Sequence, residues 1–181
     1  MSDIVPANVR AAQESGTKAA RFLAQRGVLM LKETREIGFA RDKFGASKLK
    51  ISSYILSTAK KAGIASSTSF SVQFLLQKDK NEYINLIDFD ETDELDRALT
   101  YIIRTAEKLK VEKRDYTELT YCTKDLMRFG FYQETSQDQD GYVQLSNHQA
   151  FFIEVPRFEE IRTVLVAARD HLISRGATIE D

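Results

Sequence analysis

The chain has 181 residues, of which 43% are hydrophobic, so it is long enough to bury one substantial core. Its formal net charge of −1 provides no overall attraction to nucleic acids or acidic membranes. A single cysteine, Cys122, excludes an internal disulfide framework and a cysteine-rich zinc site. No apolar run approaches the roughly 20 residues of a membrane-spanning helix, and we expect a cytoplasmic protein with no membrane association.

The N-terminal region is predicted to hold a helix. Residues 7–25 are rich in alanine and compatible with a helix, although Gly16 weakens it and Gly27 ends it. We therefore expect residues 1–27 to form a tail and a helix that either packs on the body or binds a partner. Residues 28–181 are expected to form a single α+β domain, with two candidate pseudo-repeats at 28–112 and 113–176.

Short strands separated by polar turns are predicted in both halves of this domain. In 69–77, Phe70, Val72, Phe74 and Leu76 alternate with serine and glutamine, which is typical of a strand with one buried face. Segments 28–31 and 37–40 are predicted as two separate strands, 60–65 as a loop and 134–141 as a polar loop. The remaining predicted strands are 49–58, 83–89, 116–123, 127–132, 142–145 and 151–155.

Two amphipathic helices are predicted, one after each run of strands. Over 91–110 apolar residues recur at i, i+3, i+4 and i+7, with Asp90 as the expected N-cap. Over 157–175 the stripe is repeated, with Pro156 in the first turn and Gly176 as the stop. We expect each stripe to cover the sheet that the strands just before it form.

This order predicts an α+β fold with antiparallel β-meanders, ββββα-ββββα, and an N-terminal helix. The two strand–helix stretches align without a gap at an offset of 66 residues, as Ile87 with Ile153. Either duplication or chance similarity between two sheet-packing helices explains this repeat. The order of elements, and that order alone, is similar to the whirly and PUR-repeat single-strand-binding folds.

The sequence lacks the common catalytic motifs GxGxxG, GxxxxGK[ST], HExxH, CxxC and GxSxG. His148 is interpreted as a solvated turn residue, and His171 as a positive charge that suits the end of the last helix. Cys122 is expected to be a buried, inert thiol because no histidine is near it in the sequence. Helix capping explains the acids at 88–96 better than a divalent metal does. We therefore predict no catalytic residue, no cofactor and no metal site.

Charge is segregated along the chain. Between residues 32 and 61, eight basic residues stand against three acids, whereas 79–96 holds eight acids and one lysine. Cations interleaved with rings such as Phe39 are how proteins hold single-stranded nucleic acid. Two alternatives are lysines that keep a sheet soluble and guard its edges, and self-association through complementary patches. The candidate nucleic-acid-binding residues are Arg41, Lys43, Phe44, Lys48, Lys50 and Tyr54.

The leading functional prediction is a non-enzymatic interaction or assembly module that uses its open sheet face or its N-terminal helix. Its ligand would be a protein partner or a second copy of the chain. The alternative is a single-stranded nucleic-acid-binding protein that uses the basic, aromatic-containing sheet face. A weaker third interpretation is an enzyme whose acids act without histidine.

Overall fold

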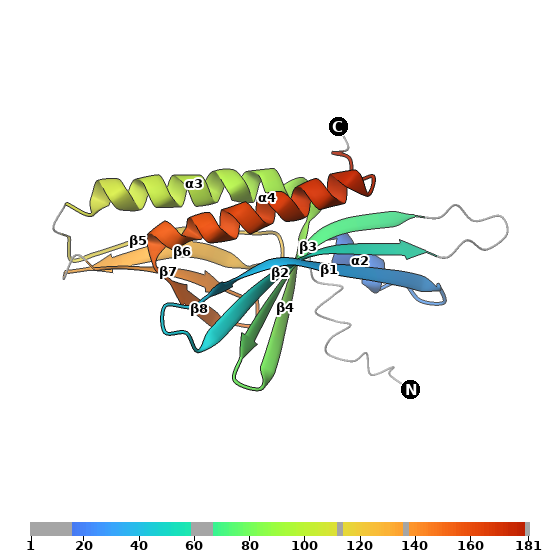
Figure 1. Ribbon diagram of the computed structural model, residues 1–181, viewed down its shortest axis with the longest axis horizontal. Coiled ribbons are helices and arrows are strands. Elements are labelled where there is room, and N and C mark those ends of the chain that lie inside the picture. Colours follow the sequence, from blue (N-terminus) through green and yellow to red (C-terminus); the bar gives the residue numbers. More distant parts are fainter. Residues whose placement is uncertain (1–15, 59–66, 112–113, 136–137, 180–181) are drawn as a thin grey trace, which may run out of the picture.

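The computed structural model describes residues 16–58, 67–111, 114–135 and 138–179. Two four-stranded antiparallel sheets, A and B, lie next to each other, and two long helices run side by side over them (Figure 1). The α+β class, the two runs of four strands and the helix after each run are confirmed. Within the described residues, no helix combines the length and apolarity that membrane crossing requires.

Sheet A is a meander in the order β1-β2-β3-β4, with strands Met30–Arg41, Ser47–Thr58, Thr68–Lys78 and Asn81–Asp88. The prediction of two strands at 28–31 and 37–40 is wrong, because β1 is one strand with a bulge between Glu36 and Gly38. The polar residues 32–36 hid this continuity, since an edge strand is exposed along most of its length. The predicted loop at 60–65 lies outside the described residues.

Sheet B is a second meander, β5-β6-β7-β8, with strands Tyr116–Cys122, Arg128–Glu134, Gln139–Gln144 and Ala150–Ile153. The predicted polar loop at 134–141 is too long, because β7 already begins at Gln139. Gly130 is required in β6 by a close approach. A Cβ there would lie 2.3 Å from the carbonyl oxygen of Leu119 and 3.0 Å from the Tyr142 hydroxyl.

The long helices α3, Thr92–Leu109, and α4, Phe158–Ser174, each follow a 3₁₀ turn, η1 at Phe89–Glu91 and η2 at Val155–Arg157. Asp90 is therefore not the N-cap of α3, and Pro156 lies in η2 rather than in the first turn of α4. The helices are joined by Arg162, whose Nε donates to Asp96 Oδ1 at 2.8 Å, and by an Arg169–Asp93 ion pair.

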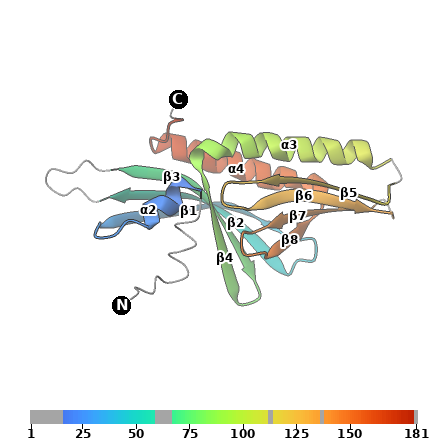
Figure 2. The same cartoon turned by 180° about the vertical axis from the view of Figure 1, so that it is seen from behind.

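Each long helix covers the sheet of the other half, which corrects the expectation that it covers the strands just before it. α3 packs on β5 and β6, whereas α4 packs on β1, β2 and β3 (Figures 1 and 2). The reason is the direct passage from β4 through η1 into α3, which carries that helix away from sheet A and over sheet B. α4 then runs back in the opposite direction.

One hydrophobic core joins the two halves. Phe74 of sheet A meets Phe129 of sheet B edge to face, with ring centroids 5.7 Å apart, and both side chains are fully buried. Asn85 of β4 adds hydrogen bonds between the halves, since its Nδ2 donates to Asp125 Oδ2 at 2.7 Å and to Ser146 Oγ at 2.9 Å. The two halves are therefore stabilised by each other.

A short helix, α2 (Lys18–Leu23), packs on the opposite face of sheet A from α4. Thr17 caps it, because its Oγ1 accepts a hydrogen bond from the backbone N of Ala20 at 3.2 Å. The remainder of the N-terminal helix that was predicted over 7–25 falls on residues 7–15, which lie outside the described part of the chain.

Candidate functional site

The outer face of sheet A, which points away from α4, has a covered end and an open end. Lys48, Lys50, Tyr54 and Leu56 all point to this face, because residues at even spacing on one strand share a side. Tyr54, Leu56 and Leu86 form a small cluster with α2, so they are buried. No helix of the described residues lies over the end that carries Lys48 and Lys50.

Strand register brings aromatic and basic side chains together at the open end. Phe39 of β1 is paired with Lys50 of β2, and Arg41 is paired with Lys48. The turn between these strands adds Lys43 and Phe44. This surface, here termed the basic hairpin face, consists of Phe39, Arg41, Lys43, Phe44, Lys48 and Lys50.

Each ring of the basic hairpin face has a cation beside it. Phe39 is 43% exposed, with Lys48 Nζ 3.8 Å and Arg41 Cζ 5.7 Å from its ring centroid. Phe44 is 71% exposed, and Lys43 Nζ lies 5.0 Å from its ring. Cation–π contacts at exposed sites contribute only about 0.5–1 kcal/mol, so these cations can exchange the ring for a phosphate at small cost.

The cations are only partly neutralised. Lys50 Nζ lies 3.3 Å and Lys48 Nζ 3.9 Å from the carboxylate of Glu36, and Lys43 pairs with Asp140 of β7. Arg41 makes no ion pair with any described residue. These side chains are partly exposed, and ion pairs near the surface are worth about 0–1 kcal/mol, so an anionic ligand can compete with them.

The hairpin that presents these residues is fixed to the second half of the molecule. The backbone N of Lys43 donates to the carbonyl oxygen of Phe152 in β8 at 2.9 Å. Tyr132 donates through its hydroxyl to Asp140, the acid that pairs with Lys43, at 3.2 Å. The position of the basic hairpin face is thus set by both sheets.

One predicted site residue is not part of this surface. Tyr54 is 4% exposed beneath α2, with Lys32 Nζ 5.1 Å from its ring centroid, so it belongs to the core and cannot stack on a base. Phe39 takes its place in the structure. Its spacing of two from Arg41, and its position in the same basic stretch, was the signal that could have added it to the candidate residues.

The acidic stretch at the end of β4 has structural roles. Asp88 is 1% exposed, and its carboxylate accepts hydrogen bonds from the backbone N atoms of Lys18 and Ala19, which holds the start of α2. Burial raises the pKa of Asp88 above its ordinary value. Asp88 therefore anchors α2 against sheet A.

The next two acids hold the turn between β5 and β6. Asp90 pairs with Lys18 at 3.3 Å and with Lys124 at 3.4 Å; partial burial opposes the shift, but these lysines lower the pKa of Asp90. Glu91 accepts a hydrogen bond from the backbone N of Lys124 at 2.9 Å, and burial raises the pKa of Glu91. Among the described residues, no group of three or more histidine, cysteine or acidic side chains is arranged to hold a metal.

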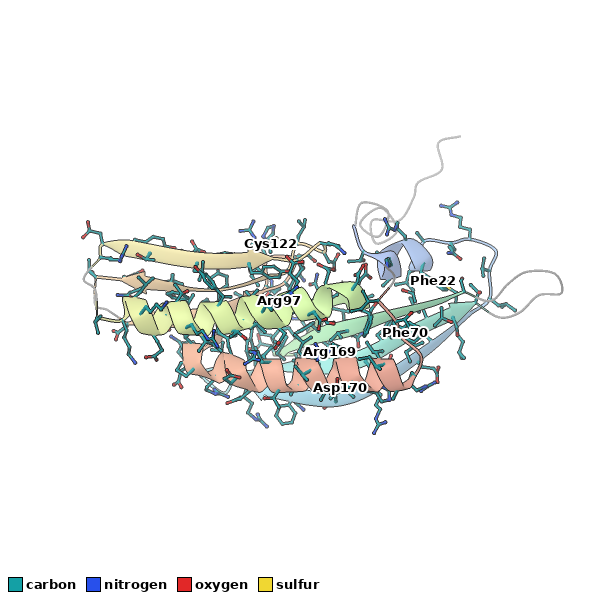
Figure 3. All side chains as sticks on the ribbon, turned by 90° about the horizontal axis from the view of Figure 1, so that it is seen from above. Phe22, Phe70, Arg97, Cys122, Arg169 and Asp170 are labelled. Atoms are coloured by element: carbon teal, nitrogen blue, oxygen red, sulfur yellow. The ribbon has the colours of Figure 1, made fainter. Side chains whose placement is uncertain are left out.

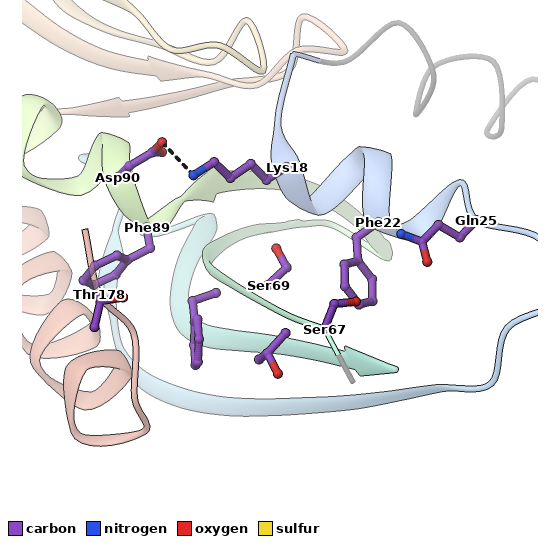
Figure 4. A pocket seen from close by; sticks show the side chains of 10 residues that line it. Lys18, Phe22, Gln25, Ser67, Ser69, Phe89, Asp90 and Thr178 are labelled. Atoms are coloured by element: carbon purple, nitrogen blue, oxygen red, sulfur yellow. Dashed lines mark ion pairs between the residues drawn. The ribbon is translucent and has the colours of Figure 1, made fainter. Parts of the chain in front are cut away.

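A pocket of about 270 Å³ lies between α2, the start of β3 and η1 (Figure 4). The Lys18–Asp90 ion pair stands at its rim, and Phe22, Phe70 and Phe89 are among its lining side chains. Its other polar lining side chains are serine, threonine and glutamine. The described lining thus contains no nucleophile with an adjacent base.

Cys122 and His171 differ from their predicted environments. Cys122 is exposed at the end of β5, so the expectation of a buried thiol is wrong (Figure 3). Alternation along the strand puts Cys122 on the same solvent face as Glu118 and Thr120. Burial, together with Arg35 and Arg175, lowers the pKa of His171, which disfavours the positive charge expected at the end of α4.

The fold alone does not identify a function, because one architecture can carry unrelated sites. The geometry described above is therefore the basis for any functional proposal. Comparisons of the chain with protein-family models, curated proteins and solved structures found no match.

Proposed function

We propose that the chain is a non-enzymatic binding module whose basic hairpin face holds single-stranded nucleic acid. The observation that carries this proposal is the exposed ring of Phe39 in a sheet surface, with Lys48 and Arg41 beside it. Proteins that bind single strands combine aromatic platforms for the bases with cations that follow the phosphates. Phe44 and Lys43 repeat the same pairing of ring and cation in the adjacent turn.

The arrangement favours a short, local contact. The whole chain is near neutral, so the attraction comes from Arg41, Lys43, Lys48 and Lys50 rather than from overall charge. If these four cations each neutralise one phosphate, the slope of log affinity against log salt is about −3, from about −0.7 per contact on a single strand.

The test is fluorescence anisotropy with a labelled oligothymidine titrated at several salt concentrations. We expect Lys48→Glu/Lys50→Glu to weaken binding at least tenfold and to reduce the salt slope. Phe39→Ala should weaken binding by about 1–3 kcal/mol with an unchanged slope, because stacking is lost but no cation is removed.

The matched control is Lys108→Glu/Lys110→Glu, which makes the same charge change at exposed positions of the α3 end. Its affinity should stay within about twofold of the unmodified protein, because long-range effects of exposed charges are screened by salt. Absence of binding at low salt would refute the proposal. Equal losses in the two double variants would refute this face as the site.

A second candidate function, a protein-interaction or assembly module, is favoured by a different observation. Leu29, just before β1, and Leu31, within it, are 68% and 58% exposed, and among the described strands β1 forms an unpaired edge of sheet A. An unpaired edge strand presents backbone N–H and C=O groups that can pair with another chain. The pattern of charges along this edge favours one partner, a second copy of the chain.

A further inference from the structure

The free edge of β1 carries charges that are complementary to themselves. Residues 32–36 are Lys-Glu-Thr-Arg-Glu, and in the opposite direction they run Glu-Arg-Thr-Glu-Lys. We propose that two copies of the chain pair antiparallel through their β1 edges, about a two-fold axis at Thr34. This inference rests on the assembly candidate above and is independent of nucleic-acid binding.

The proposed register creates four opposite-charge pairs. With Thr34 opposite Thr34, Lys32 faces Glu36 of the second copy, and Glu33 faces Arg35 of the second copy. Each contact occurs twice because the interface is two-fold symmetric. Residues that face each other in an antiparallel pair share a side of the sheet, where opposite charges stabilise the pairing.

Neighbouring symmetric registers are excluded by the same charges. Moving the axis by one residue puts Glu33 opposite Glu33 or Arg35 opposite Arg35, and like charges that face each other directly destabilise a sheet. A run of lysines that only protects an edge would repel a second copy in every register. The alternation of sign in β1 instead selects one arrangement.

The residues that this pairing requires are accessible. Lys32, Thr34, Arg35 and Glu36 are exposed, and Glu33 is partly exposed. The two acids already have partners within the chain, because Arg175 Nη2 donates to the Glu33 carboxylate at 3.1 Å and Glu36 pairs with two partly exposed lysines. Such contacts are weak, so the acids can share them with a second copy.

The bulge in β1 limits the length of the paired segment. It lies between Glu36 and Gly38, where the regular spacing of backbone groups is disturbed. Ile37 lies in the bulge and packs against the core, so regular pairing in the proposed register extends over residues 32–36.

The test is sedimentation velocity over a range of protein concentrations with charge-swapped variants. Arg35→Glu leaves two acids at positions 33 and 35, and Glu33→Arg leaves two basic residues, so each variant alone opposes like charges. We expect each to raise the dimer dissociation constant at least tenfold. The double variant Glu33→Arg/Arg35→Glu and an equimolar mixture of the two single variants restore complementary pairs and should both dimerise like the unmodified protein.

The control pair is Arg104→Glu and Glu107→Arg, which makes the same charge changes at exposed positions of α3. These variants should dimerise normally, and mixing them should add nothing at physiological salt. A protein that stays monomeric at about 0.5 mM, where even a weak contact is populated, overturns the proposal. Failure of the mixture to associate overturns it as well, provided that circular dichroism shows both single variants folded.

Discussion

The two ends of the outer face of sheet A have the same kind of strand pattern but different environments. At one end Tyr54, Leu56 and Leu86 are buried under α2, whereas at the other end Phe39 and Lys50 face solvent. A helix of six residues makes this difference. Whether an aromatic residue of a strand belongs to the core or to a binding surface is thus decided by what lies over it.

Helix α2, which covers one end of this face, is held in place by a few polar contacts. A six-residue helix has no stability of its own in water, so α2 must be held by its surroundings. Asp88 accepts from the backbone N atoms of Lys18 and Ala19, and Phe22 is buried against the sheet. The difference in burial between the covered end and the open end can therefore be tested by substitutions at either end.

The largest expected effect comes from removing one ring at each end. Tyr54→Ala should lower the free energy of unfolding by about 3 kcal/mol, because it leaves a cavity beneath α2. Phe39→Ala should cost less than about 1 kcal/mol, since it removes only exposed cation–π contacts. Urea denaturation of the two variants measures the difference, and equal losses would contradict the distinction between a covered and an open end.

A smaller effect is expected when the anchor of α2 is changed. Asp88→Asn replaces one acceptor oxygen and should cost about 1–2 kcal/mol at low pH. Because the folded-state pKa of Asp88 is raised above 3.8, its titration contributes stability that is full below that value and is lost as pH rises through the folded pKa. The gap between the unmodified protein and Asp88→Asn should therefore be wider at about pH 4 than at about pH 7.

Asp90→Asn is the matched control, and its effect on stability is expected to depend on pH in the opposite direction. The pKa of Asp90 is lowered, so its contribution is present above 3.8 and is lost as pH falls through the folded pKa. The difference in free energy of unfolding between Asp90→Asn and the unmodified protein should widen toward neutral pH. The same direction of change in both variants, in urea titrations at the two pH values, would show that the acids do not have these separate roles.

At the open end, Glu36→Gln is expected to strengthen the binding of a single strand to the basic hairpin face. It removes the carboxylate that pairs with Lys48 and Lys50, so these lysines become free for phosphates and affinity for a single strand should rise about three- to tenfold. Glu82→Gln is the control, because Glu82 contacts Gln77 rather than a lysine. An equal rise in both variants, measured by anisotropy, would mean that only net charge matters.

The smallest effect is expected where the hairpin meets sheet B. Asp140→Asn removes the partly exposed partner of Lys43 and should change the free energy of unfolding by less than about 0.5 kcal/mol. The backbone hydrogen bond from Lys43 to Phe152 remains and should hold the hairpin in place. A loss above about 1 kcal/mol in urea denaturation would show that the ion pair, not the backbone contact, fixes this surface.

Periodicity was enough to predict the fold class and the order of elements. The stripe through Leu95, Leu99 and Ile102 and the alternation in β3 are local signals, and both are present in the structure. The continuity of β1 could not be predicted, because residues 32–36 are charged on both faces. The exchange of helices between the sheets could not be predicted either, since a stripe shows that a helix is covered but not by which partner.

The candidate site could be predicted only in part, because the sequence does not show which segment covers a residue. Arg41, Lys43, Phe44, Lys48 and Lys50 all belong to the β1–β2 hairpin, and their role in binding remains a prediction. Tyr54 has the same spacing along β2 as the two lysines, so only the position of α2 shows that it is buried. For Tyr54, a contact between segments far apart in the chain decided what the sequence misassigned.

The exchange of α3 and α4 has a consequence for how such a molecule can arise. Neither half carries the helix that shields its own sheet, so a polypeptide with only one half would leave an apolar surface bare. If a single-unit ancestor had this packing, it could fold only as a dimer in which the helix of each chain covered the sheet of the other chain. Fusion of two such genes would have placed both sheets and both helices in one chain, so that the exchange of helices between molecules became the internal arrangement seen here.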